Sequence, residues 1–191
     1  MDYAFIRSSL AQLRRSRTID EVFGANGHRF ALNPVLPESE VVRFENKHGI
    51  SLPPDYRGFL THLGNGGAGP FYGVFKLGEM DDNHGHAPWD DLFVGPLMEP
   101  FPFTEAWNDL TGQPDPDGPE DEYEQQLDLF EKRYFRLIEG GFPICHIGCA
   151  KRIWLVVTGP EAGNVWQDDR AENGGVYPLL DAEARRLTFG A

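Results

Sequence analysis

Cysteine is scarce in this chain, whose 191 residues include only Cys145 and Cys149. Two cysteines do not make the disulfide framework of a small secreted domain, so a cytoplasmic location is the simplest expectation. The N-terminal segment also lacks the apolar run of roughly 7–15 residues and the small-residue cleavage site of a secretory signal. No stretch approaches the roughly 18 consecutive apolar residues of a membrane-spanning helix, so we expect no membrane association.

Basic residues are missing from one long part of the chain. The formal net charge is −13, and residues 79–131 contain 16 acidic residues without a single lysine or arginine. This balance argues against a basic face that neutralises phosphates, so we expect no nucleic-acid partner. Two interpretations of the acidic segment stay open: a solvated surface that keeps the protein soluble, or a docking surface for a basic partner.

Motifs of catalysis and metal binding are also lacking. The sequence contains no HExxH, GxSxG, P-loop or dinucleotide-binding pattern. Cys145 and His146 are neighbours, and neighbouring side chains on a strand point to opposite faces, so they do not form a nucleophile–base pair. A structural zinc site needs a second ligand pair beside the CHIGC string, and the histidines of residues 83–86 are more typical of a solvated loop. We therefore expect no enzyme, no cofactor and no metal, and two small buried thiols.

Helical patterns dominate the first third of the chain and return once later. Helices are expected over residues 4–13, from Glu38 to a stop at Gly49, from Pro53 to Gly64, and over residues 124–138. Apolar residues on one face define their inward sides. These residues are Phe5, Ile6, Leu10 and Leu13 in the first helix, Tyr56, Phe59, Leu60 and Leu63 in the third, and Leu127, Phe130, Tyr134 and Leu137 or Ile138 in the fourth.

The segment Asn65–Pro70 is rich in glycine, and we expect a tight turn with a positive φ at Asn65 or Gly66. A strand is expected over 71–77, with a possible bulge at Gly73. Short apolar runs divided by glycine-containing turns predict an antiparallel meander. Its strands should cover 142–147, 152–158, 164–167 and 176–179, with Trp154 and Trp166 in the core. Helices followed by strands predict an α+β fold, with N-terminal helices packed on a largely antiparallel sheet in a single domain over residues 1–191.

One run of residues resembles the signature of the SUKH superfamily, the Smi/Knr-type proteins related to a yeast regulator of cell-wall synthesis. The run is FENKHGISLPPDYRGFL from Phe44 to Leu60, followed by GNGGAGP up to Pro70. The later segments PFPFTEAW, residues 100–107, and WLVVTGPEAGNVW, residues 154–166, agree with it, and the resemblance covers about residues 23–187. We assign structural roles to the motif residues, which are Phe44, Glu45, Gly49, Leu52, Pro53, Tyr56, Phe59, Leu60, Asn65, Gly66 and Gly67.

The resemblance implies a protein-binding role and carries no catalytic residues. Bacterial members of this superfamily are regarded as immunity proteins that bind and block toxins, often nucleases, whereas fungal members are regulatory scaffolds. We therefore predict that the acidic surface docks on a basic toxin. The predicted partner-binding residues are Asp81, Asp82, Trp89, Asp90, Asp91, Glu99 and Trp107, although the two tryptophans better suit packing of a loop on the sheet. The alternative is a small-ligand-binding or regulatory domain with Tyr72 and the glycine-rich turn at the mouth of a pocket.

Overall fold

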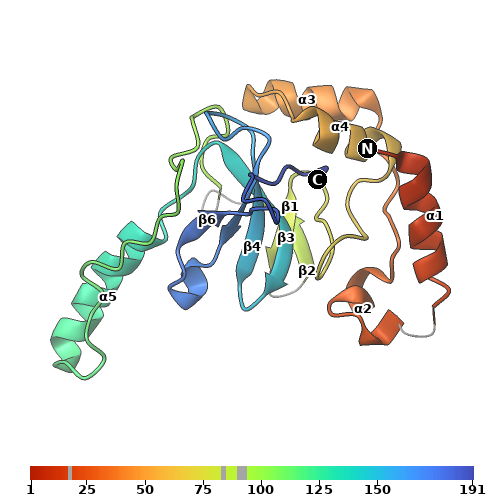
Figure 1. The fold of residues 1–191 in the computed structure, drawn as a ribbon. Coiled ribbons are helices and arrows are strands. Elements are labelled where there is room, and N and C mark those ends of the chain that lie inside the picture. The colour runs from red at the N-terminus through yellow and green to blue at the C-terminus, as the bar shows by residue number, and fades with distance from the viewer. Residues whose placement is uncertain (17–18, 83–84, 90–93) are drawn as a thin grey trace.

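The fold places helices on an antiparallel sheet (Figure 1). The computed structural model describes residues 1–16, 19–82, 85–89 and 94–191. Its α-helices are α1 (Tyr3–Leu13), α2 (Ala25–His28), α3 (Glu38–His48), α4 (Pro54–His62) and α5 (Glu120–Tyr134), with 3₁₀ turns at Ile19–Glu21 and Arg170–Glu172. The expected α+β class, with N-terminal helices on a C-terminal antiparallel sheet, is confirmed.

The main sheet is a meander of four strands in sequence order. These are β3 (Gly141–Gly148), β4 (Lys151–Val156), β5 (Val165–Asp168) and β6 (Val176–Pro178), each antiparallel to its neighbour. A separate two-stranded ribbon pairs β1 (Glu79–Asp82) with β2 (Gly85–Pro88), and the sequence patterns did not indicate it. The meander follows the expected strand positions closely because its apolar runs are local and its turns contain glycine.

Alternating side chains give the sheet two buried faces. Ile153 and Leu155 belong to the cluster that packs against α3 and α4. Trp154 and Val156 point the other way and pack with Trp166 against the segment around residues 101–103. The expected core positions of Trp154 and Trp166 are confirmed, at 3% and 0% exposed.

Helix α4 and the turn after it follow the sequence pattern. Pro54 occupies the first turn of the helix, where its missing N–H costs nothing, and Tyr56, Phe59 and Leu60 are buried as predicted. The turn then requires a left-handed residue, and Gly66 has a φ of 77°. A Cβ there would lie 2.6 Å from the carbonyl oxygen of Val74, so both the conformation and the space require glycine.

Two sequence-based expectations about elements are wrong. Residues 71–77 do not form a strand, because Phe71 is left-handed with a φ of 51° and the chain turns back between Pro70 and Gly73. Of this segment, Val74 makes only isolated bridges, to Gly67 and to Cys145. Helix α5 begins at Glu120 and ends at Tyr134, so its boundaries lie about four residues earlier than the pattern indicated.

Three predicted burials are also wrong. On α1, Phe5 is 67% exposed and Leu13 is 42% exposed, because the helix covers the core with only one narrow side. Cys145 is buried, but Cys149 is exposed in the turn after β3. The helices within the described residues include none that is long and apolar enough to cross a membrane.

Candidate functional site

Helix α5 and the loop that leads into it form a projection, which we call the acidic arm and define as residues 104–134. Figure 1 shows α5 extending away from the sheet, at the end of the molecule opposite α1. The arm is anchored at its base, where Tyr134 is fully buried and its hydroxyl donates to Asn108 Oδ1 at 2.7 Å. Beyond this anchor the arm is largely solvated, and its exposed acidic residues are Glu105, Asp115, Asp117, Glu122, Glu124, Asp128 and Glu131.

Bases from the flanking sequence neutralise part of the acidic segment. Three pairs reach the arm: Arg133–Asp109 at 2.9 Å, Lys132–Asp128 at 2.7 Å and Arg186–Glu105 at 3.6 Å. Lys76 also pairs with Glu79 at 3.3 Å, outside the arm. All four of these bases lie outside residues 79–131, so these acids are neutralised from outside the segment, which contains no base of its own. In the described part of the chain, however, Asp115, Asp117, Glu122, Glu124 and Glu131 have no basic partner.

Asp109 shows how the arm is held in shape. Hydrogen bonds from Thr111 lower the pKa of this carboxyl group, and the nearby charge of Arg133 lowers it further. The Arg133 guanidinium also donates to the backbone oxygens of Asp109 and Thr111. These contacts tie the loop to α5, so the acids beyond them are presented on an ordered element.

The two tryptophans predicted to bind a partner have packing roles. The Trp89 ring lies 4.8 Å from Phe142 and 5.6 Å from Phe44, and its Nε1 donates to the carbonyl oxygen of Glu79 at 3.1 Å. Trp107 stacks on Phe103 at 5.3 Å. Both indoles are half-buried, which matches the packing alternative, and a role in partner binding stays a prediction.

The remaining predicted partner-binding residues are less well placed. Glu99 is exposed in the loop before the acidic arm. Asp81 and Asp82 belong to β1, but their side chains are not described, and Asp90 and Asp91 lie outside the described residues. The expected clustering of these five acids beside Trp89 therefore stays a prediction.

A groove runs beside Trp89, with a volume of about 560 Å³. Its lining includes the aromatic rings of Phe44, His48 and Trp89 and the aliphatic side chains of Leu97 and Leu137. Burial lowers the pKa of His48, and the positive charge of Lys47 lowers it further. The groove is mainly apolar, and it borders the acidic segment.

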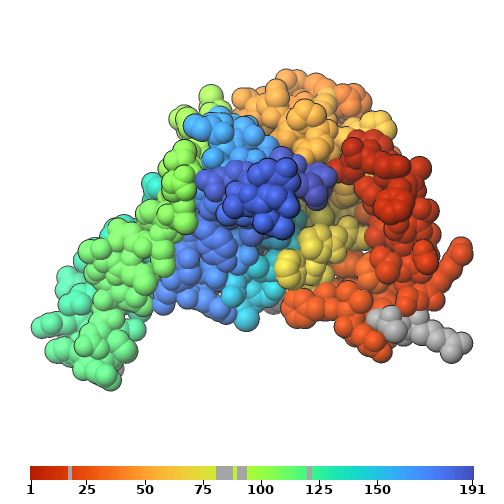
Figure 2. Space-filling view, in the orientation of Figure 1, coloured from red at the N-terminus to blue at the C-terminus, as the bar shows by residue number. Residues whose placement is uncertain are grey.

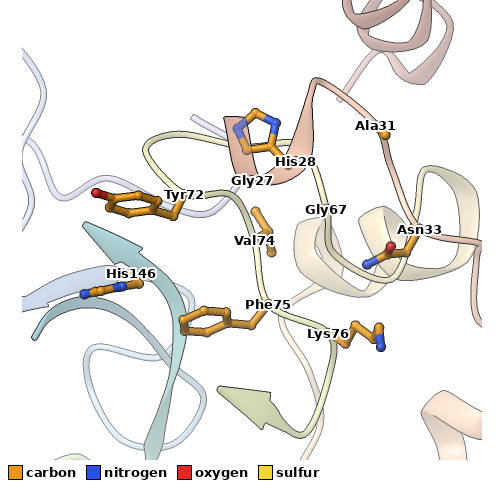
Figure 3. Close-up of a pocket in the computed structure, with 10 residues that line it drawn as sticks. All are labelled: Gly27, His28, Ala31, Asn33, Gly67, Tyr72, Val74, Phe75, Lys76 and His146. Atoms are coloured by element: carbon orange, nitrogen blue, oxygen red, sulfur yellow. The ribbon is translucent and has the colours of Figure 1, made fainter. Parts of the chain in front are cut away.

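A more polar pocket, of about 510 Å³, opens beside the glycine-rich turn (Figure 3). Tyr72 stacks on His146 at 5.3 Å, and Figure 3 places His28 across from this pair, with Lys76 at the other end. Burial lowers the pKa of His28, whose Nδ1 accepts a hydrogen bond from the backbone N–H of Phe30 at 3.0 Å. The pocket occupies the position that the small-ligand alternative predicted, with Tyr72 in its lining.

An exposed aromatic cluster borders this pocket, and the sequence patterns did not indicate it. Phe23, Phe71 and Tyr72 are 61%, 41% and 44% exposed. The Phe23 ring lies 6.3 Å from Phe71 and 5.3 Å from Tyr72 in edge-to-face contacts. One sequence feature could have predicted this exposure: each of these aromatic residues lies next to a glycine-containing turn, where side chains are seldom buried. Among the described residues, no group of three or more histidine, cysteine or acidic side chains is placed to hold a metal ion.

The fold is an α+β domain in which a helix and a glycine-rich turn precede an antiparallel meander. The sequence matches the model of the SMI1 / KNR4 family (SUKH-1) over residues 36–181. The chain therefore belongs to the SMI1 / KNR4 family, as its motif residues indicated. No curated protein and no solved structure matches the chain.

Proposed function

We propose that this chain is a non-catalytic protein-binding domain, spanning residues 1–191, that binds and blocks a toxin in the cytoplasm. Membership of the SMI1 / KNR4 family supports a domain of the toxin-immunity or Smi/Knr type. The single observation that carries the proposal is the acidic arm, which presents Asp117, Glu122 and Glu124 to solvent without basic partners among the described residues.

Electrostatics explains why such an arm suits a nuclease toxin. A nuclease binds phosphates, so its active-site surface is rich in lysine and arginine. An acidic element that covers this surface blocks substrate access without needing chemistry of its own. Complementary charge also accelerates the encounter, which matters for an inhibitor that must bind before the toxin acts.

Co-expression with the product of the adjacent gene tests this function. If that product kills the host cell alone, the chain should restore growth and should co-purify with it. Failure to rescue a lethal neighbour, together with pull-downs from the native cell that recover no toxin, would overturn the immunity proposal. A variant with Asp117→Asn, Glu122→Gln and Glu124→Gln should rescue less well, because it removes three charges that no described base neutralises.

The polar pocket at the glycine-rich turn favours a second candidate, a small-ligand or regulatory role. Its lining combines the stacked Tyr72–His146 pair with the side chains of His28, Asn33 and Lys76. Aromatic faces with a few convergent polar groups are the usual composition of a ligand site. Thermal-shift screening of metabolites and metal ions tests this role, since a saturable rise in melting temperature signals binding to the folded state. A screen without any saturable shift would contradict it.

A further inference from the structure

A third cavity, an apolar pocket, lies away from the acidic arm, between α1 and the main sheet. Its volume is about 640 Å³, within the range of roughly 300–1,000 Å³ typical of ligand sites. Ile6 and Leu10 line it from α1, Phe59 from α4, and Ile144, Ile153 and Val165 from the sheet. Figure 2 shows the red α1 on the same face as the yellow turn segment and the dark blue C-terminal segment, which also contribute to the lining.

Helix α1 covers this pocket without sealing it. None of the residues of α1 is fully buried, although its Ile6, Leu10 and Leu13 share one side at i, i+4 and i+7. Beneath them the floor belongs to the main core cluster, which includes Ile153 and Val165. A tightly packed core leaves few voids larger than a water molecule, so an apolar space of this size beside the core is suited to a guest.

Two arginines line a smaller space that adjoins the apolar pocket. A smaller pocket, of about 190 Å³, is lined by Arg7 and Arg14 and shares Leu10, Phe30 and Leu32 with the apolar one, so the two spaces adjoin. The Arg7 guanidinium donates to the carbonyl oxygen of His62. Neither arginine has a carboxylate partner in the described part of the chain. The protein has a net charge of −13, yet these two arginines beside the apolar pocket are left to pair with an anion from outside.

We propose that this site binds a free, monomeric amphiphile with one alkyl chain and an anionic head, such as the anion of a medium-chain fatty acid. The alkyl chain occupies the space between α1 and the sheet, and the head lies beside Arg7 and Arg14. Charge complementarity selects the head, because arginine forks match carboxylate geometry. Burial of the chain supplies most of the affinity, so each added methylene group should tighten binding roughly fourfold until the pocket is full.

Methyl NMR with dodecanoate, titrated below its micelle concentration, tests the location. The methyl signals of Ile6, Leu10 and Ile153 should shift saturably, whereas those of Ile138 and Val176, on the other face of the sheet, should not. Decanoate should bind more weakly than dodecanoate, and octanoate more weakly still. Absence of saturable shifts, or equal shifts on both faces, would overturn the proposal. The proposal would also be overturned if the protein sedimented with anionic vesicles but showed no NMR response to dodecanoate. That result would indicate binding to a membrane surface instead.

Matched variants and ligands test the two halves of the site separately. Arg7→Gln with Arg14→Gln should weaken dodecanoate roughly five- to tenfold and leave dodecanol binding unchanged, since exposed charge pairs are individually weak. Arg15→Gln, at the same end of α1 but outside both linings, is the control and should change neither ligand. Leu10→Trp should weaken both ligands by filling the shared space, with unshifted Ile138 and Val176 signals reporting an intact fold. Equal effects of Arg15→Gln and the double variant, or unchanged binding by Leu10→Trp, would contradict the assignment.

Discussion

At the scale of single residues, Phe59 is one of the buried side chains by which helix α4 packs into the core. It is 6% exposed, and its ring lies 5.1 Å from Phe189 and 6.3 Å from Tyr56. Phe59→Ala should lower the free energy of unfolding by about 3–5 kcal/mol, through lost burial and the cavity left behind. Urea denaturation of the two proteins measures this difference.

Phe5→Ala is the matched control, because Phe5 is 67% exposed on α1. Its unfolding free energy should stay within about 0.5 kcal/mol of the wild type, as for most surface substitutions. Equal stability of Phe59→Ala and wild type would mean that this side of α4 is not part of the core.

His48 offers a prediction about pH. Its ring lies 4.5 Å from Phe44 and 6.1 Å from Trp89, and both burial and the charge of Lys47 lower its pKa. The folded protein therefore binds this proton less readily than the unfolded chain, whose histidine pKa is about 6.5. The contribution of neutral His48 to the free energy of unfolding is therefore fully present above the unfolded-state pKa. It is lost as the pH falls through the lowered pKa of the folded state.

NMR titration of the His48 imidazole protons should give a pKa below about 6.5. His48→Asn should reduce the acid-side loss of stability measured by urea denaturation. His28, whose pKa is also lowered, remains as a second contributor in that variant. A His48 pKa at or above the ordinary value would contradict the packed environment described for the groove beside Trp89.

At the scale of elements, the turn after α4 joins the helices to the sheet. The Asn65 side-chain oxygen accepts a hydrogen bond from the backbone N–H of Leu77 at 2.8 Å, and Gly66 lies against the carbonyl oxygens of Val74 and Phe75. Gly66→Ala adds a clash to an unfavourable left-handed conformation. Gly112→Ala measures the cost of the left-handed conformation without a clash. Gly112 has a φ of 73°, and nothing lies within 4 Å of the position that its Cβ would take.

Gly112→Ala should cost roughly 1 kcal/mol, and Gly66→Ala should cost roughly 1–3 kcal/mol more. Thermal and urea unfolding of both variants measure the difference. Equal costs at the two positions would show that the space around Gly66 is not restricted.

Elements with a local signal were predictable from the sequence, and those formed by distant contacts were not. Helix α3 has acids at its start and a glycine stop at Gly49, and the meander has its own turn residues. Residues 71–77 have the alternation of a strand, but the left-handed Phe71 depends on contacts with the turn, which no local pattern records. The β1–β2 ribbon escaped prediction because EMDD and GHAP contain few strand-forming residues.

At the scale of the whole molecule, charge is separated between two ends. The acidic arm projects at one end, and α1, which contains Arg7 and is followed by Arg14 and Arg15, lies at the other (Figure 1). Such an asymmetric field orients a charged partner before contact. Composition alone predicted the acidity of residues 79–131. It did not indicate that α5 projects as an arm, because projection depends on distant contacts, such as the hydrogen bond that Arg170 donates to the backbone oxygen of Tyr134 at 3.0 Å.

The candidate site was predictable to a similar extent. The sequence indicated a pocket near Tyr72, because the glycine-rich turn exposes that residue. It did not indicate the aromatic cluster, since Phe23 and Phe71 are 48 positions apart and meet only in the folded chain. Nor did it indicate that Arg186 reaches back to Glu105 and neutralises part of the acidic segment.

The central claim is that the acidic segment recruits a basic partner, and association kinetics test it most directly. Once the toxin is identified, its association rate should fall steeply between low and high salt, because exposed charges are screened beyond roughly 8 Å at physiological ionic strength. The variant with Asp117→Asn, Glu122→Gln and Glu124→Gln should flatten that salt dependence and slow association more than it speeds dissociation. The double variant Asp90→Asn with Asp91→Asn should likewise flatten the salt dependence and slow association more than it speeds dissociation. A control with Asp20→Asn, Glu21→Gln and Glu183→Gln, which removes equal charge outside the acidic segment, should keep the steep dependence. An association rate indifferent to salt and to the arm variant would contradict the account and leave the acidity as a contribution to solubility alone.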